Sequence, residues 1–139
     1  MSEVLGAPVA GARQHYLKWN PATWVAYETC GLTHDASPGF TDRMGFRCGT
    51  CHDYPAFDLR GRRALALRVR PLHYMDTSFY AQERELPRVR ASFGDLGRLA
   101  AEVRRFGGTL NLLWHNNFLN GREERAAYLE ALSVAGGAW

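Results

Sequence analysis

The order of hydrophobic and polar residues predicts strands and helices in alternation. Leu96, Leu99 and Val103 recur at helical spacing, and two consecutive glycines then end the predicted helix. In the segment 64–74, apolar residues alternate with others, which predicts a strand. The segment 109–115 is an almost unbroken apolar run and predicts a strand buried on both faces, as in a parallel sheet. The whole pattern predicts a parallel α/β fold.

Capping residues place further elements. Asn20 followed by Pro21 is a strong helix start, and Gly31 ends that helix. Ser92, with Asp95 three residues later, predicts a capping box at the start of the helix described above. The segment 10–17 is predicted to be a short strand running into a loop, and 33–36 another short strand. An irregular stretch is predicted at 37–63 and a last helix at 123–134. Because the irregular stretch is long for a compact domain, we expect it to line something.

The composition is that of an ordinary globular protein, and together with the charge it argues against membrane and nucleic-acid partners. With 139 residues, 46% of them hydrophobic and 22% charged, the chain is predicted to form a single domain, 1–139. No apolar run approaches the roughly 18 residues of a membrane helix. The N-terminus lacks the pattern of a signal peptide, so we expect a cytoplasmic protein without a membrane partner. The net charge is only +3 and arginines alternate with apolar residues, so we expect no nucleic-acid partner.

Polar side chains follow several of the predicted strands, where parallel α/β folds place functional groups. His115 follows the most apolar strand, and an imidazole can donate a proton near neutral pH. Arg13 ends another strand, and Asp35, one strand later, is its expected ionic partner. His73 and Asp76 follow the strand 64–74. The structural alternatives are a histidine that caps a strand end and an ordinary salt bridge.

The segment Cys48-Gly49-Thr50-Cys51-His52 matches the C-x-x-C-H pattern of c-type haem attachment. Haem attachment requires an exported protein, which the sequence does not predict. Zinc bound by these residues and Cys30 would lack a second paired ligand set. We therefore interpret the two cysteines as small, partly buried loop residues, and the odd number of cysteines argues against a disulfide framework.

Taken in order, several segments resemble the second half of the polysaccharide deacetylases, the chitin-deacetylase-like members of carbohydrate esterase family four. The segments are RQHYL at 13–17, ETCGLTHDAS at 28–37, GFRCGT at 45–50, MDT at 75–77 and GGTLNLLWHN at 107–116. The resemblance implies the C-terminal half of a distorted (β/α)7 barrel with parallel strands. It also implies the family reaction, which is metal-dependent hydrolysis of N-acetyl or O-acetyl groups on carbohydrate.

The resemblance gives three residues a role. His115 falls on the late Leu-x-His motif and inherits the part of proton donor, and Arg13 falls on the motif whose arginine orients the catalytic carboxylate. Asp35 resembles the acidic residue that pairs with this arginine.

Two motifs of the family are absent from the sequence. In the family, an aspartate and two histidines hold a divalent metal, often zinc, and a neighbouring aspartate is the base; this chain has no Asp-Asp pair and no His-x-x-x-His. We therefore expect a partial deacetylase lacking the N-terminal metal-binding half, with no cofactor of its own and no activity in isolation. The alternative is a non-catalytic half barrel that forms a homodimer or complements an N-terminal half on another chain, because an open barrel leaves a sheet edge and an apolar face uncovered.

Overall fold

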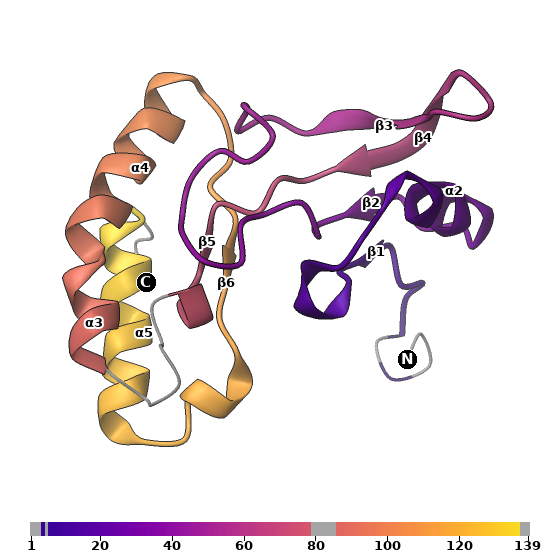
Figure 1. The fold of residues 1–139 in the computed structure, drawn as a ribbon. Helices are drawn as coiled ribbons and strands as arrows, with labels where there is room; N and C mark the ends of the chain where they lie inside the picture. The colour runs from indigo at the N-terminus through magenta and orange to yellow at the C-terminus, as the bar shows by residue number, and fades with distance from the viewer. Residues whose placement is uncertain (1–3, 5, 79–85, 137–139) are drawn as a thin grey trace.

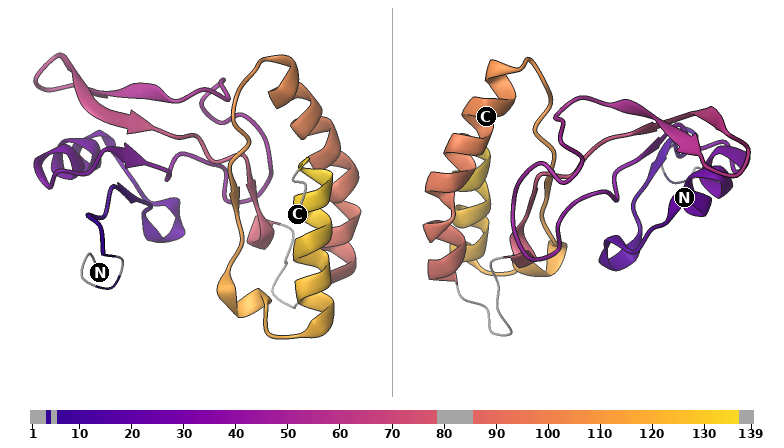
Figure 2. Two further views of the ribbon diagram at one scale, coloured as in Figure 1. Left: turned by 180° about the vertical axis from the view of Figure 1, so that it is seen from behind. Right: turned by 45° about the horizontal axis from the view of Figure 1, so that its top comes forward.

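The computed structural model describes residues 4, 6–78 and 86–136, which form two bodies side by side (Figures 1 and 2). The sheet body contains the four-stranded sheet and α2 (Pro21–Thr29). The helical body contains the two-stranded sheet and α3 (Leu86–Ala91), α4 (Phe93–Arg105) and α5 (Arg122–Val134). The prediction that no export signal is present rests partly on N-terminal residues outside the described ones.

The four-stranded sheet mixes parallel and antiparallel pairs. Its order is β1 (Gly11–Ala12), β2 (His34–Asp35), β4 (Arg63–Val69), β3 (Tyr54–Asp58). β1 and β2 are parallel, as are β2 and β4, whereas β3 pairs with β4 as an antiparallel hairpin. One face of β4 packs against α2, where Leu65, Leu67 and Val69 contact Trp24 in a buried cluster. The alternation predicted for this strand is confirmed, because the intervening residues are exposed.

In the helical body, a short parallel sheet lies against three helices (Figure 1). β5 (Tyr74–Met75) pairs with β6 (Leu112–Leu113). Tyr74 forms a core with residues of all three helices. The alternate residues Leu110, Leu112 and Trp114 are partly buried and pack against that core. The members of this core that are buried are Tyr74, Val89, Phe93, Leu96, Ala127 and Ala131.

A small apolar cluster holds the two bodies together. Leu17, from the 3₁₀ turn η1 (His15–Leu17), packs against Leu72 and Met75, with Leu113 partly buried beside them. Because η1 follows β1, and Met75 and Leu113 are the last residues of β5 and β6, this contact brings the carboxyl ends of the two sheets together. The 3₁₀ turns η2 (Asp76–Ser78) and η3 (Asn116–Phe118) follow β5 and β6.

The capping predictions are confirmed for α2 but wrong for α4. Asn20 accepts hydrogen bonds from the backbone N–H groups of residues 22 and 23, and Pro21 is the first helical residue. Gly31 adopts a φ of 76°, as expected for a residue that ends a helix. Ser92 is helical and makes no cap, because α3 ends directly before it; its hydroxyl donates to the carbonyl of Val89 instead.

Three predicted segments differ in the structure. The irregular stretch 37–63 contains β3, which the sequence concealed because Pro55 interrupts it; an edge strand tolerates proline. The strand predicted over 64–74 divides into β4 and β5, separated by Pro71. The strand over 109–115 shortens to Leu112–Leu113. Its residues are partly exposed rather than buried on both faces, because β6 has a single neighbouring strand among the described residues.

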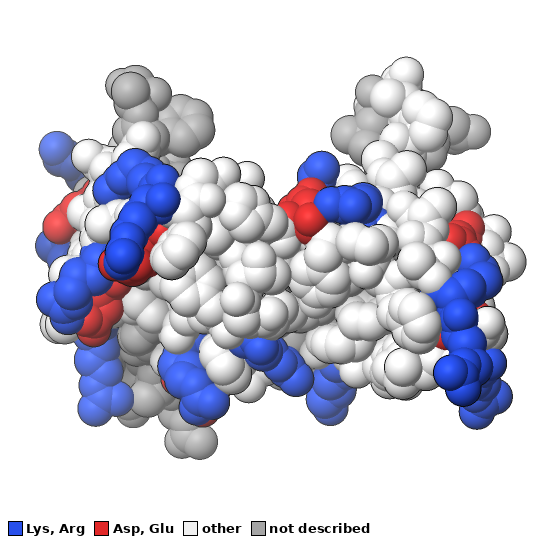
Figure 3. All heavy atoms as spheres, turned by 90° about the horizontal axis from the view of Figure 1, so that it is seen from above, with Lys and Arg blue, Asp and Glu red and all other residues white. Residues whose placement is uncertain are grey.

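The fold is therefore mixed α/β with parallel strands, and the described residues do not close into a barrel. Figure 3 shows one face, on which charged side chains of both signs lie around the outline and uncharged atoms fill the middle. In the part of the chain that the structure describes, no helix has the length and apolar character needed to cross a bilayer.

Candidate functional site

A cleft of about 610 Å³ lies where the two bodies meet. One wall is the segment 13–17, which follows β1, and the other comes from the ends of β5 and β6. Arg13 and His115 both line it, so the structure brings together two of the three residues that the sequence singled out. β1 and β6 belong to different sheets, and the apolar cluster of Leu17, Leu72 and Met75 brings their carboxyl ends together.

His115 is held by a buried carboxylate. Its Nδ1 lies 2.6 Å from Oδ1 of Asp76, and its backbone N–H donates to Oδ2 at 2.9 Å. Asp76 is fully buried, whereas the imidazole is 39% exposed at the cleft. The backbone N–H of Thr77 also donates to Oδ1, at 2.8 Å, so several donors fix the carboxylate in place.

This pairing determines which nitrogen of His115 is available for chemistry. A carboxylate only accepts hydrogen bonds, so the close Nδ1 must carry a proton. Nε2 is then the nitrogen that exchanges a proton, and among the described residues no hydrogen-bond partner engages it. The buried carboxylate also compensates the charge of a protonated imidazole. The pair can therefore act as an oriented acid or base.

The guanidinium of Arg13 is held through its Nε, whereas its terminal nitrogens are available to a ligand. Its Nε donates to the carbonyl oxygen of Ala36 at 3.0 Å. Burial lowers the pKa of Arg13, and the negative charge of Asp35 opposes that effect. Within the described part of the chain, the terminal guanidinium nitrogens make no ion pair. They remain available to a carboxylate or another acceptor in the cleft.

Asp35 does not line the cleft, and the expected ion pair with Arg13 is wrong. The β1–β2 register sets Ala12 beside Asp35, and Nε of Arg13 donates to the carbonyl oxygen of Ala36 rather than to the Asp35 carboxylate. Asp35 is fully buried instead. It accepts hydrogen bonds from Nε1 of Trp24 at 2.8 Å and from the backbone N–H and hydroxyl of Ser37. Its place is that of a buried anchor between β2 and α2.

Asp76 is the residue of the candidate site to which the sequence gave no role. Its position after a strand was recognised, but its partner is 39 positions away. The contact depends on the β5–β6 register, which sets Met75 beside Leu113 and so brings the residues that follow each strand together. The available signals were that both residues follow predicted strands and that both lie in segments of the resemblance, and neither signal joined them as a pair.

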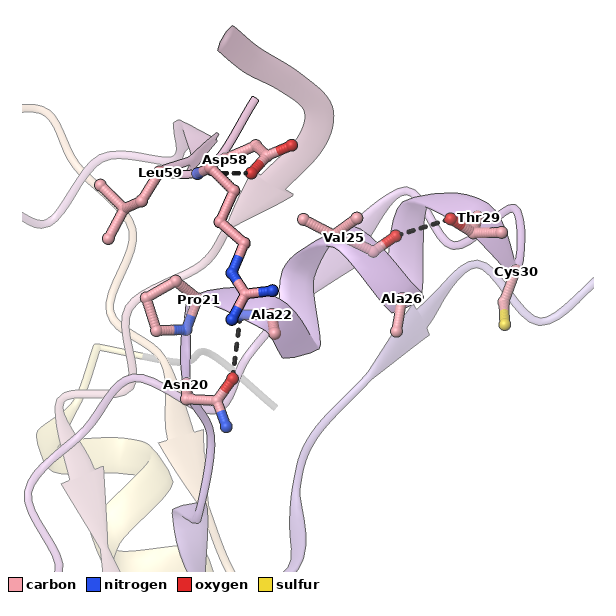
Figure 4. A pocket seen from close by; sticks show the side chains of 10 residues that line it. Asn20, Pro21, Ala22, Val25, Ala26, Thr29, Cys30, Asp58 and Leu59 are labelled. Atoms are coloured by element: carbon pink, nitrogen blue, oxygen red, sulfur yellow. Dashed lines mark hydrogen bonds between the residues drawn. The ribbon is translucent and has the colours of Figure 1, made fainter. Parts of the chain in front are cut away.

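A second cavity of about 740 Å³ lies between α2 and the β3–β4 turn (Figure 4). Its wall is largely apolar, from residues such as Val25 and Leu59. The carboxylate of Asp58 accepts N–H groups of its own turn, from Arg60 and Gly61, so its role is structural. This cavity has no oriented acid–base pair, and we place the candidate site in the first cleft.

The C-x-x-C-H segment is part of the packing. Cys51 is 4% exposed, and its sulfur lies directly over Gly108, where even a methyl group would collide with it. Its carbonyl oxygen accepts the N–H of Thr109 at 2.9 Å. The interpretation of these cysteines as small, partly buried loop residues is confirmed. A thiol turned inward in this way is not placed to bond a haem.

Within the residues that the structure describes, no group of three His, Cys, Asp or Glu side chains is arranged to hold a metal ion. The cleft offers a histidine–carboxylate pair and an arginine, which suit proton transfer and the binding of an oxygen atom. Comparison of the chain with models of protein families, with curated proteins and with solved structures finds no match.

Proposed function

We propose that this chain supplies the acid-bearing side of a carbohydrate deacetylase active site. In this proposal it is the C-terminal half of a distorted (β/α)7 barrel and resembles the polysaccharide deacetylases. The observation that carries the proposal is the cleft in which His115, held through Nδ1 by buried Asp76, faces the same space as Arg13.

The strand arrangement is consistent with part of a barrel. β1, β2 and β4 run parallel, and β5 and β6 run parallel in a second short sheet. α2 lies between β1 and β2 along the chain, and α4 lies between β5 and β6, as helices do in a βα repeat. The antiparallel hairpin partner β3 departs from such a repeat.

The geometry suits the second half of amide hydrolysis. When water has added to the acetyl carbonyl, the C–N bond breaks and the electron pair goes to the amine nitrogen of the sugar. A proton from Nε2 of protonated His115 neutralises that leaving group, and Asp76 keeps the imidazole in the required orientation. The guanidinium of Arg13 is available to orient a carboxylate or an oxygen of the reacting group.

The described residues do not fit the zinc site of the family. The proposal therefore assigns the metal ligands, and the base that takes the proton of the attacking water, to another segment or another chain. Purified alone, this chain is predicted to bind no catalytic zinc and to release no acetate. Metal-dependent acetate release from an N-acetylglucosamine oligomer by the purified chain would refute that part of the proposal.

The test starts from the DNA around the gene. The sequence before codon 1 and the neighbouring reading frames are read for a segment with an Asp-Asp pair and a His-x-x-x-His motif. That segment is expressed together with this chain, and acetate release from an N-acetylglucosamine oligomer is measured. His115→Ala is expected to lower kcat by about 10²- to 10⁴-fold, the usual contribution of a general acid. The control is His52→Ala, which changes an exposed histidine outside the cleft.

The open ends of both sheets favour a second candidate function, that of a non-catalytic assembly module. Among the described strands, β1 and β6 each have a neighbour on one side only. Such edges can pair with strands of an identical chain or of an N-terminal half barrel. Light scattering separates a dimer from a monomer, and a completed protein that binds carbohydrate but releases no acetate would favour this function over the first.

A further inference from the structure

Tyr16 presents an aromatic ring to the wall of the cleft that holds His115. It lines the cleft, yet 71% of the residue is exposed, more than the exposed aromatic residues Phe106 (60%) and Phe57 (46%). Exposed aromatic rings are common on protein surfaces, but a ring in the wall of a candidate active site can pack against a bound ligand.

The backbone of this residue is in a costly conformation. Tyr16 has a φ of 56° and Leu17 a φ of 53°, so two consecutive residues with side chains adopt the left-handed region. This region is uncommon for residues other than glycine, and such strain persists only where the surroundings hold the backbone in place.

The residues on either side of Tyr16 hold the turn. The backbone N–H of Gln14 donates to the hydroxyl of Ser37 at 2.8 Å, and the Gln14 amide donates to the hydroxyl of Tyr27 at 2.7 Å. Leu17 is buried in the cluster that joins the two bodies, and its N–H donates to the carbonyl of Gln14. With Gln14 and Leu17 fixed inward, the left-handed turn directs the Tyr16 side chain outward.

We propose that Tyr16 is the sugar-stacking residue of this cleft, on whose ring the C–H face of an N-acetylhexosamine lies while its substituent reaches His115. This inference rests on the proposed function and adds the residue that selects a pyranose ring. A cleft of about 610 Å³ lies within the range of small-ligand sites and accommodates one sugar unit of an oligomer.

Neighbouring side chains leave the ring available. The ammonium of Lys18 lies 5.5 Å from the Tyr16 ring centroid and is itself exposed, so a ligand can displace it. The His15 ring meets the Tyr16 ring in a T-shaped arrangement, with centroids 4.3 Å apart. His15 is also exposed, and it stands in the cleft wall where it can bond a sugar hydroxyl.

The test is the binding of a soluble N-acetylglucosamine tetramer to the purified chain, followed by titration in ¹H–¹⁵N spectra. Tyr16→Ala is expected to weaken binding by about three- to tenfold, the size of one aromatic stacking contact. Tyr16→Phe keeps the ring and should bind like the parent. Tyr16→Asn removes the ring but tolerates the left-handed backbone, so it separates loss of stacking from loss of fold.

The matched control is Phe106→Ala, which removes an exposed aromatic ring outside the cleft and should leave the affinity unchanged. The inference is overturned if the parent chain shows no saturable binding, or if Tyr16→Ala and Tyr16→Asn bind like the parent. The proposed function is tested separately, by acetate release from this chain expressed together with the metal-binding segment. If that activity depends on His115 while the Tyr16 variants bind normally, only the present inference fails; if Tyr16 governs binding but no acetate is released, only the deacetylase assignment fails.

Discussion

Asp76→Asn is a direct test of the pair that defines the candidate site. The carboxylate is fully buried and accepts hydrogen bonds from the backbone and Nδ1 of His115 and from the backbone of Thr77. An asparagine has one accepting oxygen, and its amide group faces one of these donors. A lost hydrogen bond to a charged group costs about 1.5–3 kcal/mol, and a buried donor left unpaired costs about 1–3 kcal/mol. Since the two effects overlap, we expect a loss of about 2–4 kcal/mol in the free energy of unfolding.

Urea unfolding followed by tryptophan fluorescence measures this loss. The control is Asp95→Asn, because Asp95 pairs with Arg98 on the exposed side of α4 and such pairs contribute about 1 kcal/mol or less. Long-range ¹H–¹⁵N spectra report the second consequence. The neutral His115 ring should carry its proton on Nδ1 in the parent and lose that preference in Asp76→Asn. Unchanged stability together with an unchanged tautomer would show that the pair is not formed as described.

Further changes test the packing around the site. Burial lowers the pKa of His73, so the unfolded chain binds a proton more readily; stability should be complete above about pH 6.5 and fall as the pH drops below it. His73→Gln should flatten this dependence in urea unfolding between pH 5 and 8. Gly108→Ala should destabilise the fold by about 1–3 kcal/mol, because its methyl group would collide with a buried cysteine. Gly97→Ala has room for a methyl group and should stabilise α4 by about 0.5–1 kcal/mol. Thermal unfolding should therefore show a lower melting temperature for the first variant and a higher one for the second. Trp24→Phe removes a donor from buried Asp35 and should cost about 1–3 kcal/mol in the same unfolding assay.

Local signals in the sequence predicted α2, α4 and α5 but missed α3, and they predicted the strands less well. The start of α2 could be predicted because it depends on adjacent residues only. Asn20 accepts hydrogen bonds from backbone N–H groups of the first turn, and Pro21 has no N–H group that would need a partner. β3 was missed because Pro55 argues against a strand until the sheet order shows that the strand lies at an edge. The length and burial of β6 were overestimated because an apolar run does not reveal how many neighbouring strands a segment has.

The difference between local signals and strand register also explains which features of the candidate site were predicted. Arg13 and His115 were singled out by the rule that parallel α/β folds place functional side chains at the carboxyl ends of strands, which needs no knowledge of register; their strands lie in different sheets that meet at the cleft. The partners of these residues depend on register. A shift of one position separates Arg13 from Asp35, and a specific pairing of β5 with β6 brings Asp76 to His115. No local pattern in the chain encodes either pairing.

The role assigned to His115 is tested most directly by comparing two acetyl substrates with different leaving groups in the completed protein. An N-acetylated sugar releases an amine that must be protonated, whereas 4-nitrophenyl acetate releases a phenolate that needs no proton. The account predicts that His115→Ala lowers amide hydrolysis by about 10²- to 10⁴-fold and leaves hydrolysis of the aryl ester nearly unchanged. Equal losses on both substrates, or full amide hydrolysis without the imidazole, would contradict it.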